Sequence, residues 1–147
     1  RQLRGDGVVV ETAHGKMAEG ELSRVMLASK VVLGNADGVD TLVFDEVDAG
    51  VGGSTARALA GVLTDLAATH QVIVVTHLAQ VASWADAQFV VTKEPPDADD
   101  DDLGVVTTIA EVNGETRVHE IARMLSGSES ETSLEHAEEL LKSSVLD

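Results

Sequence analysis

Three short apolar segments in the middle of the chain predict a β-sheet. They lie at residues 42–44, 71–76 and 88–92, and each is bounded by polar residues or glycines. Helical spacing of apolar residues at about 54–69 separates the first two, and a shorter helix at 78–84 separates the last two. The order strand, helix, strand, helix, strand is typical of a parallel sheet with right-handed crossovers. We therefore expect an α/β fold with a mainly parallel sheet and flanking helices.

Further elements are expected on both sides of these segments. From position 21, apolar residues recur at mostly three- and four-residue steps, which predicts an amphipathic helix that ends near Gly34. After the third segment, residues 105–112 favour a strand, and Asn113 with Gly114 favours a turn. A short strand at 8–10 and two helices, at 118–125 and 133–145, complete the expected elements.

The helix expected at 54–69 has a defined start and a defined buried side. Glycines precede it, and the hydroxyl group of Ser54 or Thr55 is able to cap its first turn. The side chains expected to face the core are Leu59, Val62, Leu63 and Leu66.

Size and charge bound the organisation of the chain. At 147 residues it is about one domain, and we expect residues 1–147 to form one lobe that ends in helices at 115–147. Much of the formal charge of -16 lies in an acidic loop at 94–103. The ten Lys and Arg residues are scattered and form no basic stripe, so we expect DNA contacts to involve other segments.

The sequence also limits the compartment. It has no cysteine, which excludes disulfides and thiolate metal sites. No apolar run approaches the roughly 20 residues of a membrane span, and the N-terminus lacks the layout of a signal peptide. We expect a cytoplasmic protein without a membrane partner.

Charged side chains follow two of the apolar segments directly. Asp45 and Glu46 come after the first segment, and His77 comes after the second. Ligands of parallel sheets bind beyond the carboxyl ends of the strands, so these side chains stand where sites form. Two acids and an imidazole favour metal-assisted phosphate chemistry, although polar residues also collect at strand ends without any function.

Other motifs are incomplete. His119 and Glu120 lack the second histidine of a zinc protease helix, and residues 52–56 lack the last glycine of a nucleophile elbow. The phosphate-binding loop G-x-x-x-x-G-K-[ST] is absent from this sequence. The acids therefore have no phosphate cradle within the chain.

Three stretches, in this order, carry a resemblance to a known family. They read GELSRVML at 20–27, TLVFDEVDAGVGG at 41–53 and VIVVTHLAQVASWADAQFVVTKE at 72–94, and the C-terminal stretch at 119–141 is similar as well. The chain resembles the C-terminal lobe of the RecN family, bacterial DNA double-strand-break repair proteins related to the SMC and ABC ATPases. The similarity covers nearly the whole chain from about Lys16.

The resemblance implies a partial P-loop ATPase head that uses ATP and Mg²⁺ in DNA repair and recombination. Asp45 would be the Walker B aspartate that holds Mg²⁺ through water, Glu46 the catalytic base and His77 the switch histidine near the γ-phosphate. Asp48, in the following loop, would reach across to a second head in a homodimer. DNA would be bound by the full-length protein, which would associate with the nucleoid.

The chain departs from the family in two places. Relatives read S-G-G-E at the start of the first helix, whereas this chain has Ala18, Glu19, Gly20 and Glu21 at these nucleotide-contacting positions. Glu19 brings a negative charge toward the partner's γ-phosphate; two like charges ~4 Å apart repel by about 4 kcal/mol at an effective dielectric of about 20. The N-terminal lobe with the Walker A loop is also missing, so we expect no ATP hydrolysis by this chain alone.

Two alternatives stay open at this point. A phosphoacceptor receiver domain also ends three neighbouring parallel strands in Asp, Thr and Lys, as Asp45, Thr76 and Lys93 could, but the stretch near Val10 offers only Glu11 of the acidic pair that receivers need. The other alternative is a catalytically silent module that keeps the fold and the head-pairing surface without turnover.

Overall fold

The computed structural model describes residues 19–33, 38–94 and 106–144, with the backbone alone at 19–23, 33 and 94. The chain divides into two compact units, Arg1–Trp84 and Ala85–Asp147. The expected strand at 8–10 and nearly all of the acidic loop at 94–103 lie outside the described residues. Within the described part, no helix is long and apolar enough to cross a membrane.

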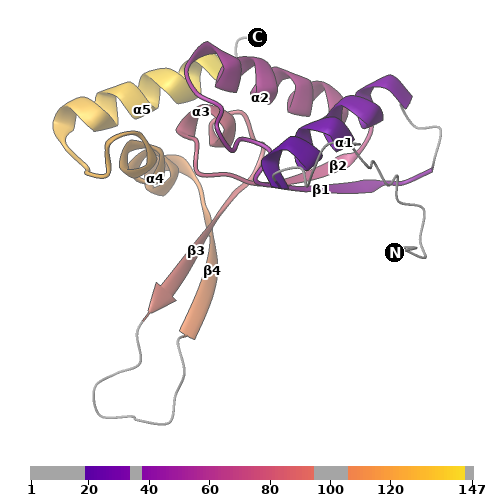
Figure 1. Ribbon diagram of the computed structural model, residues 1–147. Coiled ribbons are helices and arrows are strands. Elements are labelled where there is room, and N and C mark those ends of the chain that lie inside the picture. The colour runs from indigo at the N-terminus through magenta and orange to yellow at the C-terminus, as the bar shows by residue number, and fades with distance from the viewer. Residues whose placement is uncertain (1–18, 34–37, 95–105, 145–147) are drawn as a thin grey trace. The chain divides into compact units, whose positions relative to one another are not determined.

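The first unit contains a small parallel sheet with helices beside it (Figure 1). Its elements are α1 (Glu19–Leu33), β1 (Thr41–Asp45), α2 (Ser54–Ala67), β2 (Gln71–Val75) and α3 (Ala79–Ala82). The strands β1 and β2 pair in parallel, and their register runs from Thr41 opposite Gln71 to Asp45 opposite Val75. This is the crossover arrangement that the apolar segments predict.

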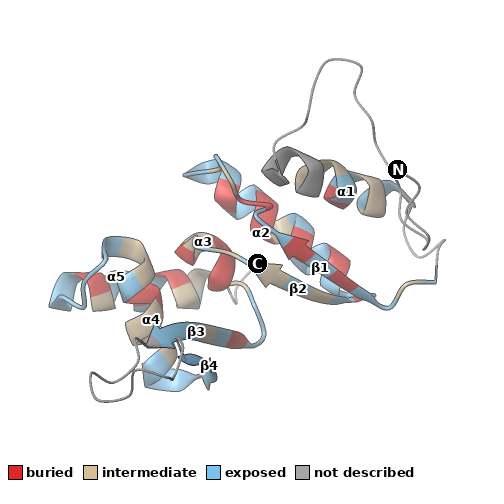
Figure 2. Ribbon diagram, turned by 60° about the horizontal axis from the view of Figure 1, so that its bottom comes forward, coloured by how far each residue is buried: buried red, intermediate tan, exposed pale blue. Residues whose placement is uncertain are grey.

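One face of this sheet carries the core of the unit. Leu42 and Phe44 of β1 are buried, whereas Val43 between them is 62% exposed. The same alternation leaves Ile73 and Val75 of β2 45% and 58% exposed. Figure 2 shows the buried residues gathered on β1, α2 and α3. The buried cluster consists of Leu27, Leu42, Phe44, Val47, Leu59, Leu63, Leu66 and Val81.

The start and the buried side of α2 differ from the sequence-based expectation. The N-cap is Gly53, with φ of 56°, and neither Ser54 nor Thr55 makes a side-chain cap. A positive φ suits glycine because it has no Cβ. Val62 is 36% exposed and was wrongly placed on the core-facing side. The inner positions are instead Ala56, Leu59, Ala60, Leu63 and Leu66.

The second unit combines a β-hairpin with two helices. Its elements are β3 (Gln88–Glu94), β4 (Val106–Val112), α4 (Gly114–Ser126) and α5 (Glu131–Ser144). β3 pairs antiparallel with β4, from Gln88 opposite Val112 to Glu94 opposite Val106. The prediction that this segment is a third parallel strand is therefore wrong in the described residues. Apolar periodicity indicates a strand but not its pairing partner.

Helix α4 is anchored to the hairpin and begins earlier than its apolar pattern indicates. Asn113 is the N-cap, and its backbone N–H donates to the Thr116 hydroxyl (3.1 Å), so the expected turn at Asn113 is the helix start. Arg117 donates from Nε to the Gln88 side chain (3.2 Å) and from a terminal nitrogen to the Ala85 carbonyl (2.6 Å). Burial lowers the pKa of Arg117, and the charge of Asp86 acts in the opposite direction.

Candidate functional site

The acidic turn after β1 begins the candidate site. Asp45 is the last residue of β1 and stands opposite Val75, the last residue of β2. Glu46 follows with φ of 54°, a left-handed conformation that is unusual for a residue with a side chain. The Ala49 N–H donates to the Glu46 carbonyl (3.1 Å) and closes the turn. Asp45 and Glu46 are both exposed at the carboxyl edge of the sheet.

A second group of polar side chains follows β2 at the same edge. Thr76 donates its hydroxyl hydrogen to Oδ2 of Asp48, and the His77 backbone N–H donates to the same oxygen (3.2 Å). The His77 Nδ1 atom lies 3.4 Å from this oxygen. The Asp48 side chain is 2% exposed and that of His77 is 75% exposed. The carboxylate is therefore enclosed by its own chain, while most of the imidazole faces solvent.

Arg24 of α1 holds the acidic turn from the other side. Its guanidinium donates to the Ala49 carbonyl (2.7 Å) and to the Val47 carbonyl (3.4 Å). This contact could not be predicted from the sequence. Arg24 lies within the GELSRVML stretch, but a lone arginine on an amphipathic helix gives no sign of a partner more than 20 residues away.

The structure brings some of the predicted site residues together and leaves others undescribed. The register of β1 and β2 sets Asp45 and Glu46 beside the strand end that leads to His77, and Asp48 contacts His77 directly. Glu19, Gly20 and Glu21 form the start of α1, where only the backbone is described. Ala18 lies outside the described residues.

Carboxylate oxygens, which are the ligands that Mg²⁺ prefers, lie at this edge. No group of three His, Asp or Glu side chains that could hold a metal ion occurs within 19–33, 38–94 and 106–144. Mg²⁺ does not need such a group, because it is usually bound by one or two carboxylates together with phosphates and water. Asp45 is an exposed carboxylate at this edge.

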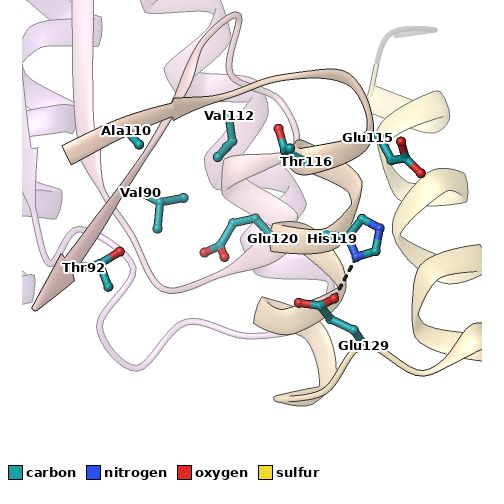
Figure 3. Close-up of a pocket in the computed structure, with 9 residues that line it drawn as sticks. All are labelled: Val90, Thr92, Ala110, Val112, Glu115, Thr116, His119, Glu120 and Glu129. Atoms are coloured by element: carbon teal, nitrogen blue, oxygen red, sulfur yellow. Dashed lines mark hydrogen bonds and ion pairs between the residues drawn. The ribbon is translucent and has the colours of Figure 1, made fainter. Parts of the chain in front are cut away.

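A separate concave surface lies in the second unit. It has a volume of about 590 Å³, and Figure 3 shows its lining residues from β3, β4, α4 and the loop after α4. Glu129 pairs with Nδ1 of His119 (2.8 Å), and Glu120 accepts two hydrogen bonds from Arg123 (2.6 and 2.7 Å). The hydrogen bonds that Arg123 donates to Glu120 raise the pKa of Arg123. Because these acids already have partners, the pocket is a weaker candidate than the edge of the parallel sheet.

The chain is similar to several curated proteins of one name. It is 52% identical over 124 residues to the DNA repair protein RecN of Treponema pallidum, which covers 84% of this chain and 21% of that protein. It is 53% identical over 122 residues to RecN of Deinococcus radiodurans (83% and 20%) and 50% identical over 129 residues to RecN of Streptomyces coelicolor (87% and 22%). The chain thus spans about a fifth of the length of these relatives. No family model matches it.

Proposed function

From its homology to a segment of RecN, we propose that this chain forms the C-terminal part of an ATPase head in a protein that repairs double-strand breaks in DNA. The observation that carries the proposal is the pairing of Asp45 with Val75. It sets Asp45 and Glu46 beside the strand end that continues into Thr76 and His77. Acids and an imidazole at one strand edge suit the terminal phosphate of a nucleotide.

Each side chain has a proposed role. Asp45 would hold Mg²⁺, and Glu46 would take the proton of the attacking water. His77 lies near the γ-phosphate. The magnesium ion neutralises charge on the phosphate oxygens when it is bound.

The start of α1 is proposed to face the nucleotide held by a second head. Backbone N–H groups at a helix N-terminus favour an anion, and Gly20 and Glu21 belong to the first turn of α1. Ala18 provides no hydroxyl group, and Glu19 adds a negative charge. We expect Ala18→Ser with Glu19→Gly, made in the complete protein, to strengthen ATP-driven head pairing; equal pairing before and after the change would contradict this role.

The uncovered sheet face supports an N-terminal Walker A lobe as a partner. Parallel sheets are normally covered on both faces, whereas Val43, Ile73 and Val75 are exposed here. The lobe that carries the phosphate-binding loop would cover this face within the complete protein. DNA would then be contacted by the complete protein, because a chain of formal charge -16 repels phosphates.

The test is ATP turnover by the complete protein with Glu46→Gln. The substitution keeps the size of the side chain and removes the base, so we expect kcat to fall by roughly 100-fold or more with ATP binding retained. Glu111→Gln, an exposed change in the hairpin, is the matched control and should leave turnover unchanged. Turnover that is insensitive to Glu46→Gln would contradict the proposal and favour a catalytically silent pairing module.

The receiver alternative lacks structural support. It needs Lys93 at the end of a parallel strand in the sheet that contains β1 and β2. Lys93 belongs to β3, whose partner in the described residues is the antiparallel β4. Phosphorylation of Asp45 by a small phosphoryl donor would support the receiver alternative.

A further inference from the structure

Among the described acidic side chains of the first unit, Asp48 is the most completely enclosed by protein. The residue is 1% exposed, and its Oδ2 atom accepts from the Thr76 hydroxyl and from the His77 backbone N–H. A buried carboxylate is stable only where hydrogen bonds replace its hydration. Here the donors come from the two residues that follow β2. The start of the loop after β2 therefore provides the hydrogen-bond donors of the buried carboxylate.

The loop after β2 is fixed through this carboxylate. Thr76 donates to Asp48 and accepts, at the same hydroxyl oxygen, from the Leu78 N–H (3.0 Å). The Leu78 carbonyl then accepts from the Val81 N–H (3.0 Å) at the start of α3. The backbone on both sides of His77 is thus held, and the direction of its Cβ is set.

Asp48 is itself held in place by the turn after β1. The Val51 N–H donates to the Asp48 carbonyl (2.9 Å), and the Ala49 N–H donates to the Glu46 carbonyl (3.1 Å). Arg24 secures the same turn through the Ala49 carbonyl (2.7 Å). These hydrogen bonds fix the turn, and with it the position of the Asp48 carboxylate.

We propose that Asp48 is a positioning residue that orients the imidazole of His77 within its own chain. The Nδ1 atom of His77 lies 3.4 Å from Oδ2, so the negative charge of the carboxylate favours a proton on Nδ1. In a neutral imidazole this leaves Nε2 as the unprotonated nitrogen, and a hydrogen bond at one ring nitrogen sets the role of the other. The His77 side chain is 75% exposed, and it follows β2 at the edge where Asp45 and Glu46 end β1.

This role differs from the cross-interface contact that the family resemblance implies for Asp48. To reach a second head, the side chain would have to leave Thr76 and His77 and expose a buried charge site. The inference rests on the proposed function only where it concerns the contact of His77 with a nucleotide. The tautomer of His77 is a property of the chain without any ligand.

The tautomer is measured by nuclear magnetic resonance on the chain with nitrogen-15-labelled histidine at about pH 8.5, where an ordinary imidazole is neutral. We expect His77 to carry its proton mainly on Nδ1, whereas free histidine prefers Nε2. The buried His70, whose Nδ1 lies 2.9 Å from the Thr69 hydroxyl, reports on the integrity of the fold. A His77 that follows free histidine would overturn the proposal without any variant.

The substitution Asp48→Asn tests whether Asp48 orients the His77 ring or only holds the backbone of the loop after β2. Its amide oxygen still accepts from Thr76 and His77, but a neutral acceptor is roughly half as strong, so the Nδ1–H population should fall by about two-fold or more. Thr76→Val should give a smaller fall, and Thr76→Ser should give none. An unchanged His77 tautomer in a folded Asp48→Asn chain would contradict the assignment.

In the complete protein, Asp48→Asn should lower kcat by roughly 10-fold with KM within about two-fold, and ATP-driven head pairing should stay intact. Weaker pairing with an unchanged kcat in the paired state would instead assign Asp48 to the cross-interface role. The resonance measurement needs no nucleotide, so its outcome stands whether or not Glu46→Gln abolishes turnover.

Discussion

At the residue scale, the backbone of Glu46 is the most informative feature of the candidate site. Its φ of 54° makes it the one non-glycine residue with positive φ in the described part of the chain. A left-handed conformation costs roughly 1–2 kcal/mol for a residue with a Cβ. A chain optimised for stability alone would place glycine there. The retained carboxylate is consistent with a functional requirement at this position.

Glu46→Gly should therefore stabilise the chain while removing its proposed base. Relief of the backbone strain, less the larger unfolded-state entropy of glycine, leaves a gain of about 0.5–1 kcal/mol in the free energy of unfolding. Urea denaturation of the chain measures this gain. Glu46→Gln keeps the strain and should stay within about 0.5 kcal/mol of the unchanged chain. A loss of stability in Glu46→Gly would show that the carboxylate itself stabilises the turn.

The exposed residues of the candidate site were easier to predict from the sequence than the buried residue Asp48. Asp45, Glu46 and His77 stand out because charged residues follow apolar segments directly. The burial of Asp48 could not be predicted, because its partners Thr76 and His77 lie 28 and 29 residues further along the chain. Only the parallel register of β1 and β2 brings these positions together.

At the element scale, α1 and the turn after β1 act as one unit through Arg24. Its guanidinium binds the carbonyl oxygens of Val47 and Ala49, which belong to the turn that carries Asp48. In the proposed head, α1 begins with the segment that faces the second nucleotide. Arg24 therefore links the pairing helix to the turn that carries the acids.

Arg24→Met should loosen this link without unfolding the sheet. Hydrogen bonds from a charged donor contribute about 1.5–3 kcal/mol, so we expect a loss of roughly 1–2 kcal/mol at this half-buried side chain. Hydrogen exchange should quicken at the amides of Ala49 and Val51 more than at those of β2. Arg57→Met on the exposed side of α2 is the matched control and should change little. Uniform quickening across the unit would contradict a local link.

Element types followed from the sequence more closely than their pairing. The apolar segments correctly indicated β1, β2 and β3, and helical spacing located α1 and α2 within a few residues. The pairing of β3 with β4 was missed because the same Val-rich alternation serves parallel and antiparallel partners. The start of α4 was missed because Asn113 and Gly114 read as a turn, whereas Asn113 caps a helix.

At the scale of the whole molecule, the exposed sheet face in the first unit is the main departure from a self-sufficient fold. Val43, Ile73 and Val75 are apolar and exposed on one side of β1 and β2. The sequence pattern favoured burial of both faces of these segments, whereas the structure buries only one face. Exposed apolar faces of this kind promote self-association.

Val43→Thr with Ile73→Thr should reduce self-association of the chain at little cost in stability. Threonine keeps the β-branched shape that suits a strand, so each change should alter the free energy of unfolding by less than about 0.5 kcal/mol. Sedimentation and binding of an apolar dye measure the exposed surface, and both signals should fall. Leu42→Thr on the core face of the same strand is the control and should cost about 2–4 kcal/mol.

In the complete protein the double variant should instead destabilise, by roughly 1 kcal/mol per residue, because a hydroxyl group would then be buried under the covering lobe. Equal stability of the complete protein with and without the double variant would mean that this face stays exposed there, and the N-terminal lobe would have to be placed elsewhere.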